Sequence, residues 1–289
     1  MFTHVVFWPW FAGLVFLAAG LVAVRKDLTT ARGLDKLIAL GPVFVAAPLA
    51  VFAADHFMTP RDIMQMVPVW MPARLFWTYF VGCAWIAAAT SLVSMKFVRP
   101  SATLLGVAFF LFVLMMDLPA AVSDPGNRLA WNFVLRESAF AGGAWALAGS
   151  RSRESQTGKR NWMILIGRFC VAIASIFYGI EQLLHPELAP GVPDVALTPA
   201  WVPLHALWGY PVGALLLVAG AALLLNQRPR VGATWIGVVM VLLTVCLYLP
   251  ILAVTRDPSQ MIEAINVVFD TMFFGGMALA VARALPAEG

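Results

Sequence analysis

The sequence predicts an all-α, polytopic membrane protein with about nine transmembrane helices. Hydrophobic residues make up 61% of the 289-residue chain and charged residues only 12%, and the mean hydropathy is +0.85. About 20 apolar residues in a helix cross a hydrocarbon core of about 30 Å, and segments of that length recur along the whole chain. No sizeable soluble domain is expected. We place the spans near residues 5–24, 37–57, 75–96, 102–122, 129–149, 162–184, 201–225, 232–254 and 263–283.

The distribution of basic residues predicts how these spans are oriented. If the N-terminus lies outside, most lysines and arginines fall in inner loops and in the C-terminal tail, and few are left for the outer loops: Arg61, Arg74, Arg128 and Arg256. The positive-inside rule therefore predicts a bacterial-type inner (plasma) membrane protein with its N-terminus outside and its C-terminus cytoplasmic. The formal charge of +4 reflects this topology, and no nucleic-acid partner is expected.

A motif of prolines and aromatic residues occurs twice and organises the chain. Every residue of the first copy recurs 131 positions later: Pro68, Trp70, Pro72, Trp77, Tyr79 and Gly82 correspond to Pro199, Trp201, Pro203, Trp208, Tyr210 and Gly213. The chain has only 11 tryptophans and 4 tyrosines, so this many matches at one spacing indicate two copies of a single unit.

The repeated motif predicts a division of the chain into four parts. Residues 1–36 form an extra N-terminal transmembrane helix with a basic inner loop, and residues 37–149 form a first four-helix unit. A basic cytoplasmic linker, residues 150–161, leads to a second four-helix unit, residues 162–284. An even number of spans in each unit gives both units the same orientation, which is the parallel type of internal repeat.

The second unit contains three short patterns in order: Gly167-Arg168, then Phe177-Tyr178-Gly179-Ile180-Glu181-Gln182, then Asp270 followed by Phe273-Phe274-Gly275-Gly276. These patterns resemble the DoxX/DoxD family of integral membrane proteins. The first unit matches more loosely, through Asp55-His56 and through Arg136-Glu137 before Gly142-Gly143. The resemblance implies a tandem duplication of the family's four-helix unit, and a membrane component of a quinone-linked or thiol/sulfur redox system that works with protein partner subunits.

Ionisable residues inside the spans are the first candidates for a site, because a charge in a bilayer is costly and usually functional. We expect a polar pocket in each unit that binds a lipid head group or a quinone ring, with a carboxylate as proton relay. The alternative is structural, with the acids joining helices through hydrogen bonds to Asn132, Asn266, tryptophan N–H groups or Arg136. The candidate residues are Asp55, His56, Arg136, Glu137, Glu181 and Asp270.

The repeated aromatic residues have two interpretations. They lie where helices begin at the outer surface, where aromatic belts form in membrane proteins, and the flanking prolines suit a fixed entry into a helix. They are also candidates for a lid over each pocket. This set comprises Trp70, Trp77, Tyr79, Trp201, Trp208 and Tyr210.

The sequence gives little sign of a metal or a bound cofactor other than a quinone. Cys83, Cys170 and Cys246 are isolated within separate spans, so we interpret them as packing residues. A copper site is a weaker alternative, with soft ligands from His56, Met58, Met64 and Met66. Three functions therefore stay open: a quinone-linked oxidoreductase subunit, a non-catalytic lipid or small-solute binding or transport module, and an assembly factor for a membrane complex.

Overall fold

The computed structural model describes residues 4–152, 161–191, 197–205 and 207–287. These residues are helical almost throughout, and the only strand-like pairing among them is an isolated bridge between Leu188 and Leu197. Seven of the described helices are long and apolar enough to cross a membrane. This confirms the prediction of an all-α chain with several helices that could cross a membrane. Most of the predicted linker, residues 153–160, lies outside the described residues.

Two of the nine predicted spans are not among these seven helices. Helix α8 (Arg128–Ser150) has 23 residues but contains Arg136 and Glu137, which lower its hydropathy. Helix α11 (Gly209–Leu224) has 16 residues and is therefore about 24 Å long. The predicted span at 201–225 began too early, because residues 201–205 form turns and Leu204 has a left-handed φ of 55°. Such a residue interrupts a right-handed helix.

The remaining helices differ widely in length. Short helices α2, α4, α7 and α13 lie at the ends of longer ones, and a 3₁₀ turn, Met64–Met66, follows α4. Their bounds are α1 His4–Ala23, α2 Arg25–Thr30, α3 Asp35–Met58, α4 Pro60–Ile63, α5 Arg74–Ser94, α6 Val98–Phe112, α7 Leu118–Ser123, α10 Trp162–Leu184, α12 Pro229–Leu243, α13 Leu249–Val254 and α14 Pro258–Ala284.

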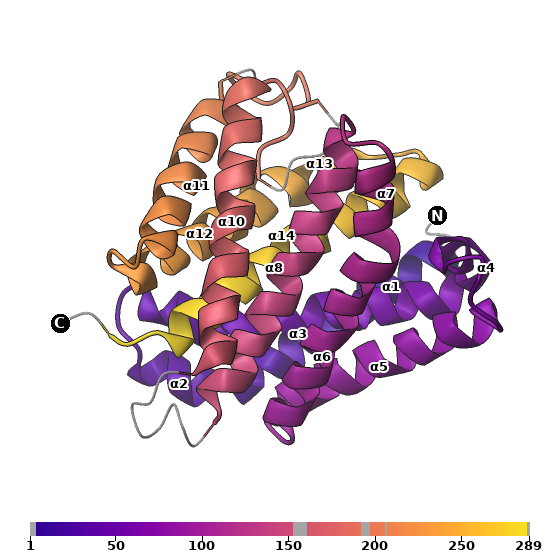
Figure 1. Ribbon diagram of the computed structural model, residues 1–289, viewed down its shortest axis with the longest axis horizontal. Helices are drawn as coiled ribbons and strands as arrows, with labels where there is room; N and C mark the ends of the chain where they lie inside the picture. The colour runs from indigo at the N-terminus through magenta and orange to yellow at the C-terminus, as the bar shows by residue number, and fades with distance from the viewer. Residues whose placement is uncertain (1–3, 153–160, 192–196, 206, 288–289) are drawn as a thin grey trace.

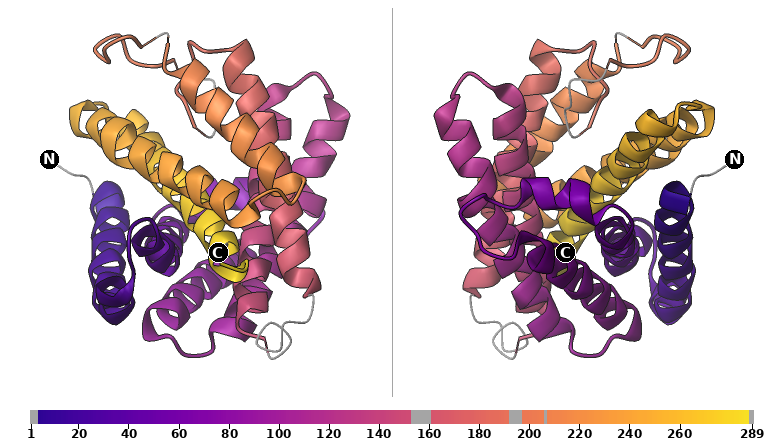
Figure 2. Two further views of the ribbon diagram at one scale, coloured as in Figure 1. Left: turned by 90° about the vertical axis from the view of Figure 1, so that its left-hand side faces the viewer. Right: turned by 90° about the vertical axis from the view of Figure 1, so that its right-hand side faces the viewer.

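Helices α8 and α14 lie at the centre and contact each other. Helix α8 also packs against α6 and α10, while α14 packs against α12 and α3. In Figure 1, α14 runs diagonally between α3 and the upright α10. Phe140 of α8 and Phe273 of α14 meet edge-to-face with ring centroids 4.5 Å apart, and both are fully buried. Helix α1 packs against α3 at the edge of the molecule (Figure 2).

The connections between helices gather at two opposite ends of the molecule. In Figure 1, helix α2, the α5–α6 connection, the α11–α12 connection and the C-terminus lie toward the lower left, whereas α4, α7 and α13 lie toward the upper right. The first end carries many of the basic residues: Arg25, Lys26, Lys96, Arg151, Arg228 and Arg283.

Two π-helical turns occur 131 residues apart, at Val113–Asp117 and Thr244–Tyr248. Each continues a long helix into a short one, and each is followed directly by a Leu-Pro pair. A proline such as Pro119 has no N–H for the carbonyl four residues earlier and its ring presses against that carbonyl. The wider π turn accommodates this local disruption. The shared Leu-Pro pair therefore accompanies the same local backbone in both halves of the chain.

Left-handed residues also recur at that spacing, with Ala73, Met95 and Phe97 in the first half and Leu204, Asn226 and Arg228 in the second. The repeated motif gives a matching hydrogen bond in each half. Trp77 Nε1 donates to the Pro72 carbonyl at 3.1 Å, and Trp208 Nε1 donates to the Pro203 carbonyl at 2.8 Å. Each bond fixes the loop just before a helix, as the prolines predicted.

Replacing Trp77 with phenylalanine should lower the free energy of unfolding by about 1 kcal/mol, because it removes only the indole N–H that bonds to Pro72 and a net hydrogen bond contributes about that much. Thermal unfolding in a mild detergent measures the effect. Trp162, an exposed tryptophan on α10, gives the control Trp162→Phe, for which no change in Tm is expected. Equal effects of the two substitutions would contradict the role of the hydrogen bond.

Candidate functional site

The centre of the molecule holds an ion-pair network that joins α8 to α14. Arg136 Nη1 donates to Asp270 Oδ2 at 2.8 Å, and Arg136 Nη2 donates to Glu137 Oε1 at 3.1 Å. Only 20% of the Arg136 side chain, 13% of Glu137 and 19% of Asp270 are exposed. Three of the predicted candidates therefore form one site. We call Arg136, Glu137, Asp270, Asp55 and Asp117 the central cluster.

Aromatic rings hold the Arg136 guanidinium in place. Its Cζ lies 4.8 Å from the centroid of the Phe133 ring and 5.9 Å from that of Phe140. A planar guanidinium packs well on aromatic faces while its N–H groups reach carboxylates in a fixed geometry. Phe133 and Phe140 lie about one turn on either side of Arg136 in α8, so the helix itself supplies both the charge and its apolar support.

Two further acids complete the central cluster. Asp55 of α3 lies within electrostatic range of Asp270, and Asp117 lies within range of Arg136 and Glu137. Asp117 is the last residue of the first π turn. The π turn and Pro119 thus determine where this acid enters the site.

Tyr178 of α10 closes the central cluster on one side. It is fully buried and lies within electrostatic range of Arg136, Glu137 and Asp270. Its hydroxyl donates to the backbone carbonyl of Asn132 at 3.3 Å. A phenol in this position adds another group that can exchange a hydrogen bond or a proton.

The central cluster contains more acid than base. Four carboxyl groups and one guanidinium would carry a net charge of −3 if all were ionised, a cost that a membrane interior does not support. Part of this negative charge must therefore be compensated, by protons or by a bound group.

Several buried polar atoms of this region have no hydrogen-bond partner among the described residues. They include both donors and acceptors, a set that water or a polar ligand group would satisfy. These atoms are Asp117 Oδ2, Asn132 Oδ1, Arg136 Nε, Glu137 Oε2 and Asn266 Oδ1. Asn132 is only 6% exposed and precedes Arg136 by one helical turn, on the same face of α8.

The other sequence candidates lie outside this network. Glu181 forms an ion pair with Arg128 at 2.5 Å, and the Arg128 side chain is 41% exposed. The His56 ring Nδ1 lies 2.7 Å from the Phe52 carbonyl, so Nδ1 carries the proton and donates. We expected one pocket in each unit. The structure instead gathers acids from both halves into one cluster, because α8 and α14 pack against each other.

The repeated aromatic residues face outward. Trp70 is 68% exposed and Trp201 is 50% exposed, and the indoles of Trp77 and Trp208 bond to their own loops. Tyr79 and Tyr210 are also exposed, and Tyr79 stacks on Phe57. These positions favour a role at helix starts and on the membrane-facing surface over a lid on the central cluster.

The residues considered for copper are spread over the end of α3 and the 3₁₀ turn after α4. His56 is bonded to its own helix, Met58 and Met66 are exposed, and Met64 belongs to the 3₁₀ turn after α4. Within the described ranges, no group of three or more His, Cys, Asp or Glu residues is placed to hold a metal ion. The three cysteines are free and lie in α5, in α10 and in the second π turn.

Sequence reasoning missed Asp117 and Tyr178. Asp117 is an acid within a predicted span and could have been found on that ground. The residue 131 positions later is Tyr248, so the second half has no matching acid that would draw attention to it. Tyr178 belongs to the family-like pattern of the second unit, but a phenol is not charged and was not among the ionisable candidates.

One family model, described as a domain of unknown function (DUF8561), matches residues 45–140. This segment contains four members of the central cluster, Asp55, Asp117, Arg136 and Glu137, and stops before Asp270. The search of curated proteins gave no match, and the search of solved structures gave none either. The resemblance to the DoxX/DoxD family stays a prediction.

Proposed function

We propose that the chain consists of two DoxX-like four-helix units in tandem, preceded by an extra helix, and that it crosses a bacterial-type inner membrane nine times. The recurring left-handed residues, π turns and Trp–Pro hydrogen bonds support the duplication. So does the packing, because the contacts α3–α5, α6–α8 and α3–α14 correspond to α10–α11, α12–α14 and α10–α8.

The basic residues at one end of the molecule support a cytoplasmic location for that end, with the N-terminus outside. Helix α8 counts as a span because its charged residues are buried in the protein, where lipid does not meet them. We call the basic end the inner end from here on.

We propose that the central cluster binds the polar head of a lipophilic small molecule, with a quinone as the first candidate, and supplies or takes up its protons. The observation that carries this proposal is a single buried arginine among four acids, with polar atoms left unpartnered. A quinone head offers two carbonyl oxygens as acceptors, and its reduction by two electrons consumes two protons. Protonated carboxyl groups can supply those protons.

The electrons would come from a partner subunit, so the protein would act as the membrane component of a quinone-linked redox system. The three cysteines lie on different helical segments without pairing. Any thiol or sulfur chemistry therefore belongs to a partner in this proposal.

A second candidate is a binding or transport module that performs no chemistry on a lipid or small solute. The position of the central cluster favours it, because the cluster joins the last helices of the two proposed units. Substrate sites of repeat-built transporters lie at the interface between the repeats.

Neutralising the acids of the central cluster should weaken quinone binding. We expect Glu137→Gln and Asp270→Asn, which keep side-chain size, to lower the affinity for a short-chain quinone at least about 10-fold, as loss of a charge-assisted hydrogen bond does. Mass spectrometry of quinone co-purified in mild detergent, followed by titration of the purified variants, measures this.

Glu181→Gln is the matched control, because Glu181 is an acid of the same membrane region outside the central cluster. It should bind quinone like the wild type. Wild-type quinone affinity in both cluster variants, with the fold intact by thermal unfolding, would overturn the proposal. A bound lipid or solute without electron transfer to quinone from any donor would favour the second candidate.

A further inference from the structure

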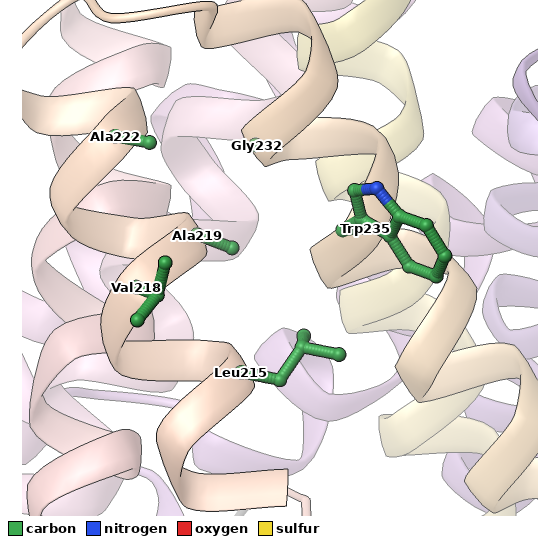
Figure 3. A pocket seen from close by; sticks show the side chains of 6 residues that line it. All are labelled: Leu215, Val218, Ala219, Ala222, Gly232 and Trp235. Carbon is green, nitrogen blue, oxygen red and sulfur yellow. The ribbon is translucent and has the colours of Figure 1, made fainter. Parts of the chain in front are cut away.

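Helices α11 and α12 enclose an apolar groove on the surface of the molecule. Its volume is about 310 Å³, and it is lined by Leu215, Val218, Ala219, Ala222, Gly232 and Trp235. Figure 3 shows the α11 side chains on one side and the Trp235 ring on the other. Val218 is 69% exposed and Trp235 is 43% exposed, so the groove faces the lipid in the proposed topology.

Small residues lie at the base of the groove. Leu215 and Ala222 are seven residues apart, or about 10 Å along the helix. Ala219 is nearly buried, and Gly232 sits so close to α11 that an added Cβ would lie 2.7 Å from the Ala219 carbonyl oxygen. An apolar strip of this length on the lipid-facing surface suits a hydrocarbon chain.

The inner end of the groove is polar and basic. The Gln227 backbone N–H donates to the carbonyl of Ala222, a groove residue, at 2.9 Å. Arg228 follows, exposed and left-handed with φ 49°. It precedes Gly232 by four residues, or about 6 Å along the helix. Nearby, Arg168 of α10 bonds to Asn226.

We propose that this groove is a binding site for an anionic glycerophospholipid of the inner leaflet, with an acyl chain between α11 and α12 and the phosphate at Arg228. Basic residues at the cytoplasmic ends of transmembrane helices bind anionic head groups in this way. Arg228 forms no ion pair with a protein carboxylate in the described part of the chain. The site uses no residue of the central cluster and goes beyond the proposed quinone function.

The first half of the chain lacks the same combination. At the matching spacing, Phe97 replaces Arg228 with the same left-handed backbone, and Leu104 replaces Trp235. Lys96, also at the inner end, lies beside Phe97. The proposal therefore predicts one specific lipid per chain, and the first half supplies matched controls.

Native mass spectrometry of the purified full-length protein tests the site, with dioleoyl phosphatidylglycerol and dioleoyl phosphatidylcholine as probes. We expect one molecule of phosphatidylglycerol to be retained in preference to phosphatidylcholine. Arg228→Gln should weaken its binding about fivefold, as expected for one basic residue near an anionic membrane surface. Ala222→Phe should abolish the retained lipid by filling the groove.

Lys96→Gln and Ala87→Phe are the controls, because they make the same changes at the inner end and on the lipid-facing surface of the first half. Both should retain phosphatidylglycerol like the wild type. Equal retention of the two lipids, or wild-type retention in both Arg228→Gln and Ala222→Phe, would overturn the proposal. So would a co-purifying membrane protein that is lost in Ala222→Phe while the lipid stays. Quinone affinity should be unchanged in Arg228→Gln, which separates this result from failure of the central cluster.

Discussion

Replacing Arg136 with methionine should lower the free energy of unfolding by about 3–5 kcal/mol, the range found when one partner of a buried ion pair is removed. Arg136 is the shared donor to Glu137 and Asp270, and without it these largely buried acids lose their cation. The Tm in detergent should fall accordingly. This is the largest effect we expect from a single side chain in the central cluster.

A second substitution tests the cause of that loss. Adding Asp270→Asn to Arg136→Met should recover part of the stability, because it removes one of the acids left without a cation. Arg128→Gln breaks the more exposed pair with Glu181 and should change the stability by no more than about 1 kcal/mol. If Arg136→Met unfolds at the wild-type temperature, the central ion pairs do not stabilise the fold.

Replacing Gly167 with alanine should destabilise the protein by about 3 kcal/mol, at the upper end of the range for overpacking a core. A Cβ at this position would lie 2.3 Å from the Gly142 carbonyl oxygen of α8 and 2.7 Å from the Ala146 Cβ. The carbonyl belongs to the backbone and cannot rotate away. Helices α8 and α10 would have to separate, which thermal unfolding would report as a lower Tm.

The same change should also weaken quinone binding. Helix α8 carries Arg136 and Glu137, so a displaced α8 would move both residues away from Asp270. Gly126→Ala is the control, since the nearest atom to its added Cβ is Asp124 Oδ1 at 3.8 Å. Its stability should stay within about 0.5 kcal/mol of the wild type. If Gly167→Ala is as stable as the wild type, α8 and α10 are not in close contact at Gly167 and Gly142.

The sequence predicted the helical class well because long apolar segments determine it directly. It also identified Arg136, Glu137 and Asp270 as candidates, since charges within such segments are conspicuous. It offered Arg136 as one of several partners for the acids, but it could not single out the pair with Asp270, 134 residues away. Composition and spacing indicate which segments are helices, but the choice of neighbours depends on close contacts such as the one between Gly167 and Gly142.

Residues that match between the two halves predict the shared backbone better than the chemistry of the site. They identified the loops before α5 and α11, where Trp77 and Trp208 form equivalent hydrogen bonds. They did not identify Asp117, because the matching residue is Tyr248. The two halves have the same local backbone at the π turns, but the first turn ends at Asp117 and the second at Tyr248. Only the first half therefore supplies an acid at this position.

If α11 crosses the membrane as proposed, its short length also affects the lipid around the protein. Its 16 residues cover about 24 Å, less than the hydrocarbon thickness of about 30 Å. This hydrophobic mismatch requires the bilayer beside α11 to become thinner, and the deformation costs a fraction of a kcal/mol for each ångström. The shell of lipid around the molecule is then asymmetric, with its thinnest part beside α11. A thin bilayer therefore suits the protein better than a thick one.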